Sequence, residues 1–420
     1  MTTITMRRTL LASAVLLATL PGLSHARCET LSNVKPGEIN IVGNAFPALQ
    51  HIAKEMQSCT QGGVKVQVKM TPQIQQEVQQ AFGSSGKSAF DAAVISMGVF
   101  ADLQSKGQLQ PMTDLVAKYK AKYKIEDNML IKVNGEVMAI AFMQNAQNLY
   151  YRKDVFEKHG IKAPTSYAEM MAAARMLKDK EPGIEFPIAQ TFAKGWDSAT
   201  EFTNIFAGYG GKFFKAGSAA PDFSSDAGVK ALETMKAMTA YMTPNYLASN
   251  SDDVMNQFQQ GKAAMGVLWA TRAARMDDPA ASKIVGKMDF VAAPAAMPGG
   301  KSATHMWWDG VAMPKNLGGD RETVFQVLME ALDEETTKSG NDLAVWVRSS
   351  YKPTRFGTGV SASAKAGAPM WPTEPYFGLA HGEIGKVLPD VMSGAMAPKQ
   401  ALDIAAAAYS KAAAEKGFIK

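Results

Sequence analysis

Cysteine and histidine are scarce in this chain, and their scarcity excludes most metal and thiolate sites. The 420 residues include 2 cysteines and 5 histidines. The histidines beyond residue 26 are His51, His159, His305 and His381, and none has the spacing of a metal-binding pair. Neither a G-x-S-x-G elbow nor an H-E-x-x-H pair occurs. We therefore expect no metal site, no cofactor and no catalytic centre encoded by a local motif.

The apolar run near the N-terminus is too short to span a membrane. It covers residues 10–20, whereas a spanning helix needs roughly 20 apolar residues. Two arginines precede this run and Ser24-His25-Ala26 follows it as a small-x-small cleavage site, so residues 1–26 are predicted to be a cleaved signal peptide. A membrane anchor is the alternative. A lipoprotein is disfavoured, because Arg27 stands where a small residue should precede a lipidated Cys28. We expect export to the periplasm.

A strong charge of one sign is also lacking. The chain has 44 Lys and Arg against 39 Asp and Glu, a formal net charge of +5. Removal of residues 1–26 takes away Arg7 and Arg8 and no acidic residue, so the net charge falls from +5 to +3. Such a small and dispersed charge does not indicate binding to nucleic acid or to a lipid surface.

Both cysteines lie close to the start of the exported part of the chain, where an oxidising compartment favours a disulfide. Residues 39–42 are expected to form a strand, and residues 45–58 a helix that returns antiparallel to it. The end of that helix, near Cys59, then lies beside the segment that carries Cys28. We expect a Cys28–Cys59 disulfide, and two free thiols are the alternative.

Strand-like and helix-like segments alternate along the chain, which indicates an α/β fold with largely parallel sheets. Residues 64–68 alternate between apolar and polar side chains, and residues 90–97 form a nearly continuous apolar run. Ser166 and Glu169 have the spacing of a capping box at the start of a helix. The length exceeds one hydrophobic core, so two domains are expected. No flexible linker separates them, and we expect the chain to cross between them at residues 141–145, 304–313 and 346–353.

The most specific segment of the sequence runs from Val254 to Trp269. Val254 and Phe258 lie one helical turn apart, and Gly261 is suited to end that helix because glycine adopts the left-handed conformation without strain. An uncharged run of strand length follows and ends at Trp269, where open α/β sheets present side chains to ligands. Residues 258–265, Phe-Gln-Gln-Gly-Lys-Ala-Ala-Met, resemble the FxxGKAAM signature of the extracellular solute-binding proteins of ABC importers, in the branch similar to maltose-binding protein.

Two further parts of the sequence resemble the same family. Residues 90–95 with 107–112 resemble its YDVV…GxLxPL segment, and residues 139–142 with 148–156 resemble its GLPY…LLYYRKDLFEKxG segment. The resemblance implies a two-lobed periplasmic-binding-protein fold, in which each lobe is a mostly parallel sheet flanked by helices. The three crossovers would form the hinge.

The lobes follow from these crossovers. We expect residues 27–141 and 310–345 to form the N-terminal lobe, and residues 142–309 and 346–420 the C-terminal lobe. The resemblance implies a monomer that performs no chemistry, binds a carbohydrate or polyol between the lobes, and delivers it to the membrane permease of an ABC importer.

Residues 81–88 match a loose form of the phosphate-binding loop. A true phosphate loop follows a strand and opens a helix, so that backbone N–H groups and the helix dipole hold the anion. Here a helical segment, residues 73–81, comes before the loop and a strand comes after it. We interpret the segment as a surface turn.

Tryptophans are the strongest candidates for contact with a ligand. A sugar presents an apolar C–H face and a rim of hydroxyls, so its site needs aromatic planes together with carboxylates, amides and arginines. Each tryptophan could instead belong to the core. Placement at turns, strand ends and crossovers favours a role in binding for Trp196 with Asp197, for Trp269, and for Trp307 or Trp308 with Asp309.

Polar candidates stand at the same kinds of position. Asn44 and Ser96 lie at the ends of predicted strands, although Asn44 could simply cap the first helix. The others lie in or after the crossovers: Gln144, Asn145, Arg348, Tyr351 and Arg355. The arginines could instead form ion pairs between the lobes.

Two other functions are compatible with the sequence. An exported carbohydrate-active enzyme would need two carboxylates at glycosidase separation, for which Asp197 and Asp309 are the candidates. A purely structural surface protein would show no stabilisation by any small ligand.

Overall fold

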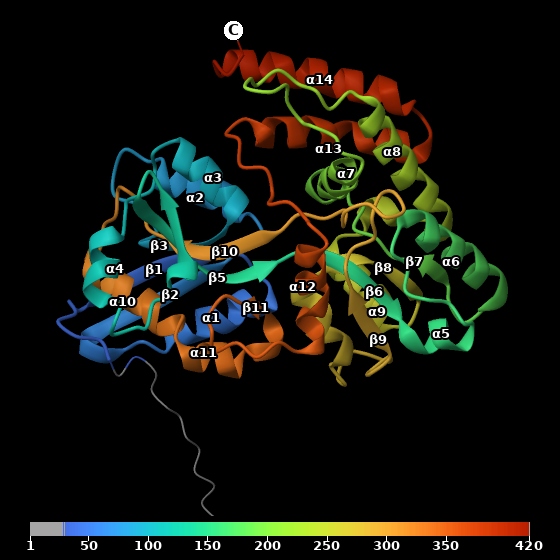
Figure 1. Cartoon of the computed structure of the whole chain (residues 1–420). Helices are drawn as coiled ribbons and strands as arrows, with labels where there is room; N and C mark the ends of the chain where they lie inside the picture. Colours follow the sequence, from blue (N-terminus) through green and yellow to red (C-terminus); the bar gives the residue numbers. More distant parts are fainter. Residues whose placement is uncertain (1–27, 29, 420) are drawn as a thin grey trace, which may run out of the picture.

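The computed structural model describes Cys28 and residues 30–419, so the predicted signal peptide lies outside the described residues. Two lobes lie side by side, and the long helices α13 (Phe377–Ser393) and α14 (Pro398–Glu415) stack above α7 (Trp196–Gly208) at the top of Figure 1. None of the described helices combines the length and the apolar character needed to cross a membrane.

The first lobe is built on a seven-stranded sheet. Its strand order is β11-β5-β10-β3-β1-β2, and β4 also pairs with β5. The strands are β1 (Gly37–Gly43), β2 (Val64–Met70), β3 (Ala92–Ser96), β4 (Leu130–Val133), β5 (Glu136–Asn145), β10 (Trp307–Ala312) and β11 (Val345–Trp346).

Helices cover both faces of this sheet, because successive side chains of a strand point to opposite faces. Val42 and Ile95 pack with the helices α2 (Ile74–Phe82) and α3 (Met97–Ser105). Their neighbours Ile41 and Val94 pack on the other face with α1 (Pro47–Gln57) and α10 (Arg321–Ala331). The shorter helices α4 (Thr113–Tyr119) and α11 (Glu334–Ser339) complete this lobe.

The second lobe is built on a four-stranded sheet with the order β7-β8-β6-β9. Its strands are β6 (Gln147–Arg152), β7 (Phe186–Ile188), β8 (Ala263–Trp269) and β9 (Met288–Val291). The flanking helices are α5 (Lys153–Lys158), α6 (Tyr167–Lys180), α7, α8 (Asp226–Met238), α9 (Ser251–Gln259), α12 (Thr358–Lys365), α13 and α14.

The local predictions around the signature segment are confirmed. Helix α9 ends at Gln259, and Gly261 has a φ of 74°, in the left-handed region that glycine tolerates. Strand β8 then runs to Trp269 with nearly every residue buried. At α6 the side chain of Ser166 accepts a hydrogen bond from the backbone of Glu169, as its predicted capping role requires.

The two-lobed α/β architecture is confirmed, but the prediction of mostly parallel sheets is wrong. Strand β1 pairs in parallel with β2 and β3, and β7 with β8, whereas β10 is antiparallel to β3 and β5, and β6 is antiparallel to β8 and β9. Strands β4 and β11 are also antiparallel to β5, and β4 forms a hairpin with it. The physical reason for the other reversals is that β6 and β10 enter from the opposite lobe. Each therefore starts at the shared edge and runs away from it, while its neighbours run toward it.

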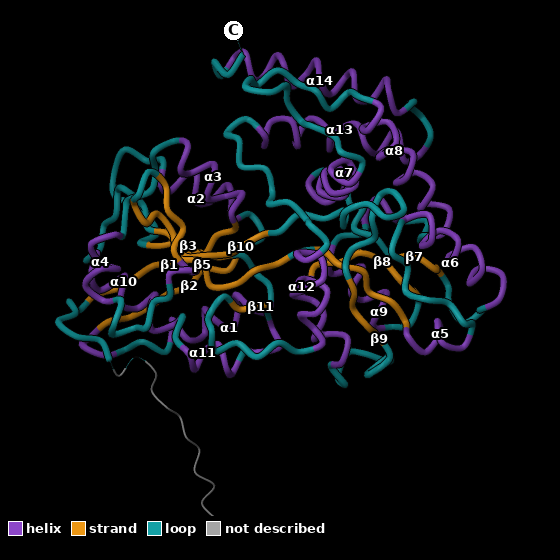
Figure 2. The backbone as a smooth tube through the Cα atoms, viewed as in Figure 1, coloured by secondary structure: helices purple, strands orange, loops and turns teal. Residues whose placement is uncertain are grey.

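The chain passes between the two sheets three times. Strand β5 leads almost directly into β6, the chain returns before β10, and it leaves again between β11 and α12. The first lobe's sheet therefore keeps residues 142–145 and 307–309, which the predicted boundaries assigned to the C-terminal lobe, because β5 and β10 each continue to the shared edge. Figure 2 shows the strands of both sheets meeting across the boundary between the lobes. The ends of several strands are thereby brought to one place.

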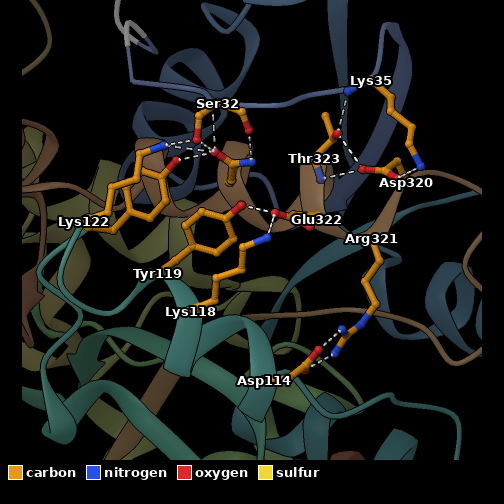
Figure 3. A network of polar contacts seen from close by, with 12 residues as sticks. Ser32, Lys35, Asp114, Lys118, Tyr119, Lys122, Asp320, Arg321, Glu322 and Thr323 are labelled. Atoms are coloured by element: carbon orange, nitrogen blue, oxygen red, sulfur yellow. Dashed lines mark hydrogen bonds and ion pairs between the residues drawn. The ribbon is translucent and has the colours of Figure 1, made fainter.

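A disulfide and a polar network fasten the N-terminal segment to the first lobe. Cys28 and Cys59 are bonded, with Cα atoms 5.1 Å apart, which confirms the predicted pair. Lys35 forms an ion pair with Asp320, the residue that caps α10, and Arg321 binds Asp114 through both terminal nitrogens at 2.6 and 2.7 Å (Figure 3). The guanidinium of Arg321 lowers the pKa of Asp114 to about 2.

Candidate functional site

A cavity of about 190 Å³ lies at the boundary between the lobes. Strands β3, β5 and β8 end beside it at Ser96, Asn145 and Trp269, and β10 begins beside it at Trp307. The complete lining is Asn44, Phe46, Ser96, Asn145, Trp196, Ser251, Trp269, Thr271, Arg272, Trp307 and Asp309. The cavity thus draws on both lobes, as is common for sites at strand ends of α/β sheets.

Three tryptophans form the aromatic wall of this cavity. The rings of Trp196 and Trp269 are stacked, with centroids 6.2 Å apart and planes inclined by 26°. Trp307 meets Trp269 edge-on at 5.5 Å and 82°. Trp196 remains 48% exposed although it is a large aromatic residue. An exposed aromatic plane at the mouth of a cavity is available to a ligand rather than to the core.

A second compartment of about 330 Å³ continues on the other side of Trp196 and Trp307. Trp371, Phe377 and His381 line it, and Ser96 borders both compartments. The ring of Trp371 lies 4.2 Å from that of Trp307 and 5.6 Å from that of His381. The cleft is therefore longer than the first cavity alone and aromatic along most of its course.

The predicted tryptophans divide into two groups in the structure. Trp196, which was expected in a turn, is the first residue of α7 and follows Gly195, whose φ is 90°. Trp307 and Trp308 alternate along β10, so only one of them can face the cleft. Trp307 does so, whereas Trp308 packs edge-on against Phe100 at 5.2 Å. Trp308 is thus a residue of the first lobe's core.

Of the two predicted aspartates, Asp309 lines the cavity, whereas Asp197 follows the lining residue Trp196 and lines neither compartment. Asp309 is 6% exposed, and burial raises the pKa of its carboxyl group to about 7. Burial likewise raises the pKa of Asp197 to about 6, while the nearby Arg272 opposes the rise. Neither carboxylate of this pair has a hydrogen bond to another described residue. From its place in the lining, Asp309 can accept hydrogen bonds from ligand hydroxyls.

Arg272 joins the two lobes at the edge of the cavity. Its guanidinium lies 5.5 Å from the ring centroid of Phe46, which precedes α1 in the first lobe. Its Nε is 3.6 Å from a carboxylate oxygen of Asp252, and it donates a 3.2 Å hydrogen bond to Thr271. Burial lowers the pKa of Arg272. The side chain is held in place and retains an Nε with no hydrogen bond to described residues.

Of the predicted polar candidates, Asn44, Ser96 and Asn145 line the cavity. The alternative for Asn44 does not hold, because Phe46 occupies the N-cap position of α1. Gln144 alternates with Asn145 along β5, points away from the cavity and is exposed. Asn145 is itself buried, and its side-chain oxygen accepts a hydrogen bond from the backbone of Ala146.

The three candidates after the third crossover lie outside both compartments. Arg348 is buried and donates to the backbone carbonyls of Leu332, Lys124 and Tyr123. Arg355 forms an ion pair with Asp277 and donates to the carbonyl of Met288. Tyr351 is half-buried beside the first lobe's core. These side chains are already engaged within the protein, so we leave them out of the proposed site.

Several lining residues were missed by sequence reasoning. Arg272 and Thr271 follow Trp269 closely, so their place after a strand that ends at the cleft could have indicated them. Phe46 follows Asn44 in the same way. Trp371 and His381 carried no such signal. Trp371 stands between prolines, and a bridge between Met306 and Met370 brings it beside the start of β10.

A buried polar network supports the second lobe behind the cavity. Glu201 accepts hydrogen bonds from Gln147 and Gln190 at 2.8 and 2.6 Å and from Thr191. Asn204 donates to Gln147 at 2.6 Å and contacts His305 at 2.7 Å. Burial raises the pKa of Glu201 to about 7 against the effect of its three donors. Because His305 packs on Trp371 at 5.4 Å, the network reaches the wall of the second compartment.

The composition of the first cavity is suited to binding a small polar molecule. Among the described residues, no three His, Cys, Asp or Glu side chains are grouped as metal ligands. The first cavity instead combines aromatic planes with carboxylate, amide, hydroxyl and guanidinium groups. This composition matches small, polyhydroxylated molecules that have apolar faces.

Comparison of sequences places the chain among transport proteins. A family model described as bacterial extracellular solute-binding protein matches residues 43–317. The mannitol-binding protein of Pseudomonas aeruginosa is 25% identical over 232 residues, which are 54% of this chain and 52% of that protein. The chain thus matches about half the length of this curated relative.

Comparison of structures gives similar folds over almost the full length. An ABC transporter solute-binding protein from Agrobacterium radiobacter, solved with ribitol, superposes with a TM-score of 0.78 at 20% identity. It covers 90% of this chain and 100% of its own. A solute-binding protein from Agrobacterium vitis, solved with D-mannitol, gives a TM-score of 0.77 at 18% identity, with coverages of 91% and 100%. At these identities the likeness establishes the fold.

Proposed function

The chain belongs to the bacterial extracellular solute-binding proteins, and from this membership we propose that it captures a sugar or polyol between its lobes for an ABC importer. The observation that carries this proposal is the composition of the cavity. Trp196, Trp269 and Trp307 offer apolar planes, and short polar side chains surround them. A sugar or polyol requires both, since its C–H groups pack on aromatic rings while its hydroxyls replace the water around buried polar groups.

The comparisons support the ligand class. The curated relative is named for mannitol, and the two similar structures contain ribitol and D-mannitol. These ligands are small enough for a cavity of the observed size. We therefore place linear polyols and monosaccharides first among the candidates.

Delivery would depend on closure of the lobes around the ligand. The first lobe contributes Asn145 and Asp309, and the second contributes Trp196 and Trp269. A ligand that contacts both lobes stabilises the closed arrangement relative to the open one. The membrane permease would recognise that arrangement, with a monomeric binding protein acting in the periplasm and performing no chemistry on its ligand.

A thermal-shift screen tests the proposed function. Purified protein is heated with sugars, polyols, amino acids and polyamines, and the melting temperature is compared with that of the free protein. A ligand at 100 times its dissociation constant stabilises by roughly 2.7 kcal/mol. We expect hits among sugars or polyols. A clear amino-acid hit with no response to any hydroxylated compound would remove the assignment, and no response to any class would favour a structural role.

One observation favours a second candidate function. Asp309 lines the cavity, Asp197 follows the lining residue Trp196, and the pKa of each is raised, as for the general acid of a glycosidase. Incubation with oligosaccharides and aryl glycosides, followed by analysis of the products, distinguishes the two functions. Hydrolysis that disappears in Asp309→Asn would establish an enzyme, whereas a binding protein returns the compounds unchanged.

A further inference from the structure

The charges that line the cleft differ in sign from the charge of the chain. The chain carries a formal net charge of +5. The acidic groups that line the two compartments are Asp309, Asp102 and Glu374, whereas Arg272 is the one lysine or arginine among the lining residues. His381 also lines the cleft, but burial lowers its pKa to about 4, so it is neutral at pH 7. A cleft lined mainly by one sign of charge concentrates ligands of the opposite sign.

Arg272 does not compensate for the acidic lining, because its charge is already matched. It forms an ion pair with Asp252 and faces the ring of Phe46. It also attracts Asp197, the carboxylate that follows the lining residue Trp196. Asp102 has its own partner, a 2.8 Å ion pair with Lys106. Asp309 and Glu374 are left, and of these Glu374 is exposed to water.

Among the acidic residues that line the two compartments, Asp309 is the one that is buried and has no counter-charge. It is 94% buried on the strand β10, faces the first cavity, and has no hydrogen bond or ion pair with a described residue. Its partners in the neighbouring strands are Ser96 and Met143, which are uncharged. Trp307 lies two residues earlier on the same face, and its Nε1 is buried without a partner. Buried charges in proteins are normally paired, so this position calls for a group from outside the chain.

We propose that the ligand carries a protonated amine beside its hydroxyl groups, and that the amine lies against Asp309 and the faces of Trp269 and Trp307. This inference rests on the proposed function and narrows its ligand class to amino polyols and amino sugars. The carboxylate supplies the counter-charge in a site that excludes water. Aromatic faces attract a cation through their quadrupole, most strongly for tryptophan. The hydroxyls would meet Ser96, Asn145 and Arg272.

A matched pair of ligands tests the proposal. Sorbitol and N-methyl-D-glucamine share a carbon chain and differ by one hydroxyl replaced with a charged methylamine. Their dissociation constants are measured at pH 8 by calorimetry or by tryptophan fluorescence. We expect N-methyl-D-glucamine to bind at least about tenfold tighter, the factor that a modest desolvated cation–aromatic contact supplies. The ratio should decrease in Asp309→Asn and persist in Asp179→Asn, which removes an exposed carboxylate from α6.

The outcomes separate this inference from the proposed function. Equal or tighter binding of sorbitol, or a preference for the amine that survives in Asp309→Asn, overturns the inference and leaves a neutral polyol as the ligand. Binding of tetramethylammonium or putrescine without binding of any sugar, polyol or amino polyol supports the cation site but removes the sugar or polyol function. Failure of all these compounds to bind at millimolar concentration overturns both.

Discussion

Two side chains in the cleft have exposures opposite to what their chemistry favours. Trp196 is 48% exposed, whereas Asp309 is 6% exposed. Either arrangement is unfavourable in an empty site, because apolar surface remains in water and a carboxylate remains without it. A bound ligand with an apolar face and polar groups would cover the indole of Trp196 and give the carboxylate of Asp309 a partner. The two residues therefore suit tests that separate a role in binding from a role in folding.

Trp269 and Trp308 form a matched pair for such a test. We expect Trp269→Ala to weaken ligand binding by at least about 2 kcal/mol, because a stacking plane in the cavity is lost. Trp308→Ala should instead lower the free energy of unfolding by about 3–5 kcal/mol, since Trp308 packs on Phe100 in the core. Titration calorimetry and urea denaturation measure the two effects. Near-normal affinity in a severely destabilised Trp269→Ala variant would show that Trp269 belongs to the core.

The raised pKa of Asp309 leads us to expect that the stability of the folded protein depends on pH. Its pKa in the folded protein is raised from 3.8 to about 7, so the folded protein binds more protons than the unfolded chain between those values. Its contribution to stability therefore falls as pH rises from about 4 to about 7 and stays low above this window. A pKa shift of this size corresponds to a loss of about 4 kcal/mol of stability when the Asp309 carboxyl ionises. In Asp309→Asn the buried amide that replaces the carboxyl costs about 1 kcal/mol.

We expect Asp309→Asn to be more stable than the natural chain by up to about 3 kcal/mol at pH 8 and less stable than it by about 1 kcal/mol at pH 4. Denaturation curves of the ligand-free proteins at the two pH values measure the difference. Asp179→Asn, which changes an exposed carboxylate, is the control. A constant difference at both pH values would contradict an ionised, unpaired carboxylate at this position.

Helices and strands place the site through their ends. Strands β3, β5 and β8 bring one residue each to the cavity where they end, α7 brings one where it begins, and β10 brings Trp307 and Asp309 from its first three residues. Helix α1 starts next to Phe46 at the cavity and ends near Cys59, which is bonded to Cys28. The disulfide thus fastens the end of α1 that lies away from the ligand.

Removal of the disulfide should affect stability and spare binding. The bonded cysteines are 31 residues apart. In the chain-entropy description, closing a loop of that length stabilises the protein by about 3–4 kcal/mol. We expect Cys28→Ser with Cys59→Ser to lose about this much free energy of unfolding. Ligand affinity, measured in the same buffer, should stay within about twofold because the bond does not touch the cavity.

The two lobes together form a site that neither contains alone. Three chain segments connect them, and Arg272 of one lobe contacts Phe46 of the other beside the cavity. A ligand seated between Asp309 and Trp269 would add contacts of the same kind. The relative position of the lobes is therefore the variable that links binding to recognition by a permease.

Small-angle scattering should detect this change. We expect the radius of gyration to decrease when a ligand found in the screen is added to saturation, because the closed arrangement gains contacts from both lobes. Trp269→Ala at the same ligand concentration should show less compaction. A profile that is unchanged at confirmed saturation would contradict closure about the hinge.

Much of the fold could be predicted because its signals are local. The end of α9 just before Gly261, the buried strand to Trp269 and the cap at Ser166 each depend on a few neighbouring residues. The sheet directions could not be predicted in this way. Strands β6 and β10 have ordinary strand sequences, and their reversal follows from entering each lobe at the shared edge.

The sequence alone determined the α/β class, the paired cysteines, the family and the tryptophans at the ends of elements, because each follows from nearby residues. Tertiary structure decided which of two adjacent side chains faces the cleft, choosing Trp307 over Trp308 and Asn145 over Gln144. It also brought Trp371 to the site from a distant segment and engaged Arg348 with backbone carbonyls. These outcomes depend on how two lobes pack and on which polar groups remain unpaired, and such properties belong to contacts between residues far apart in the chain.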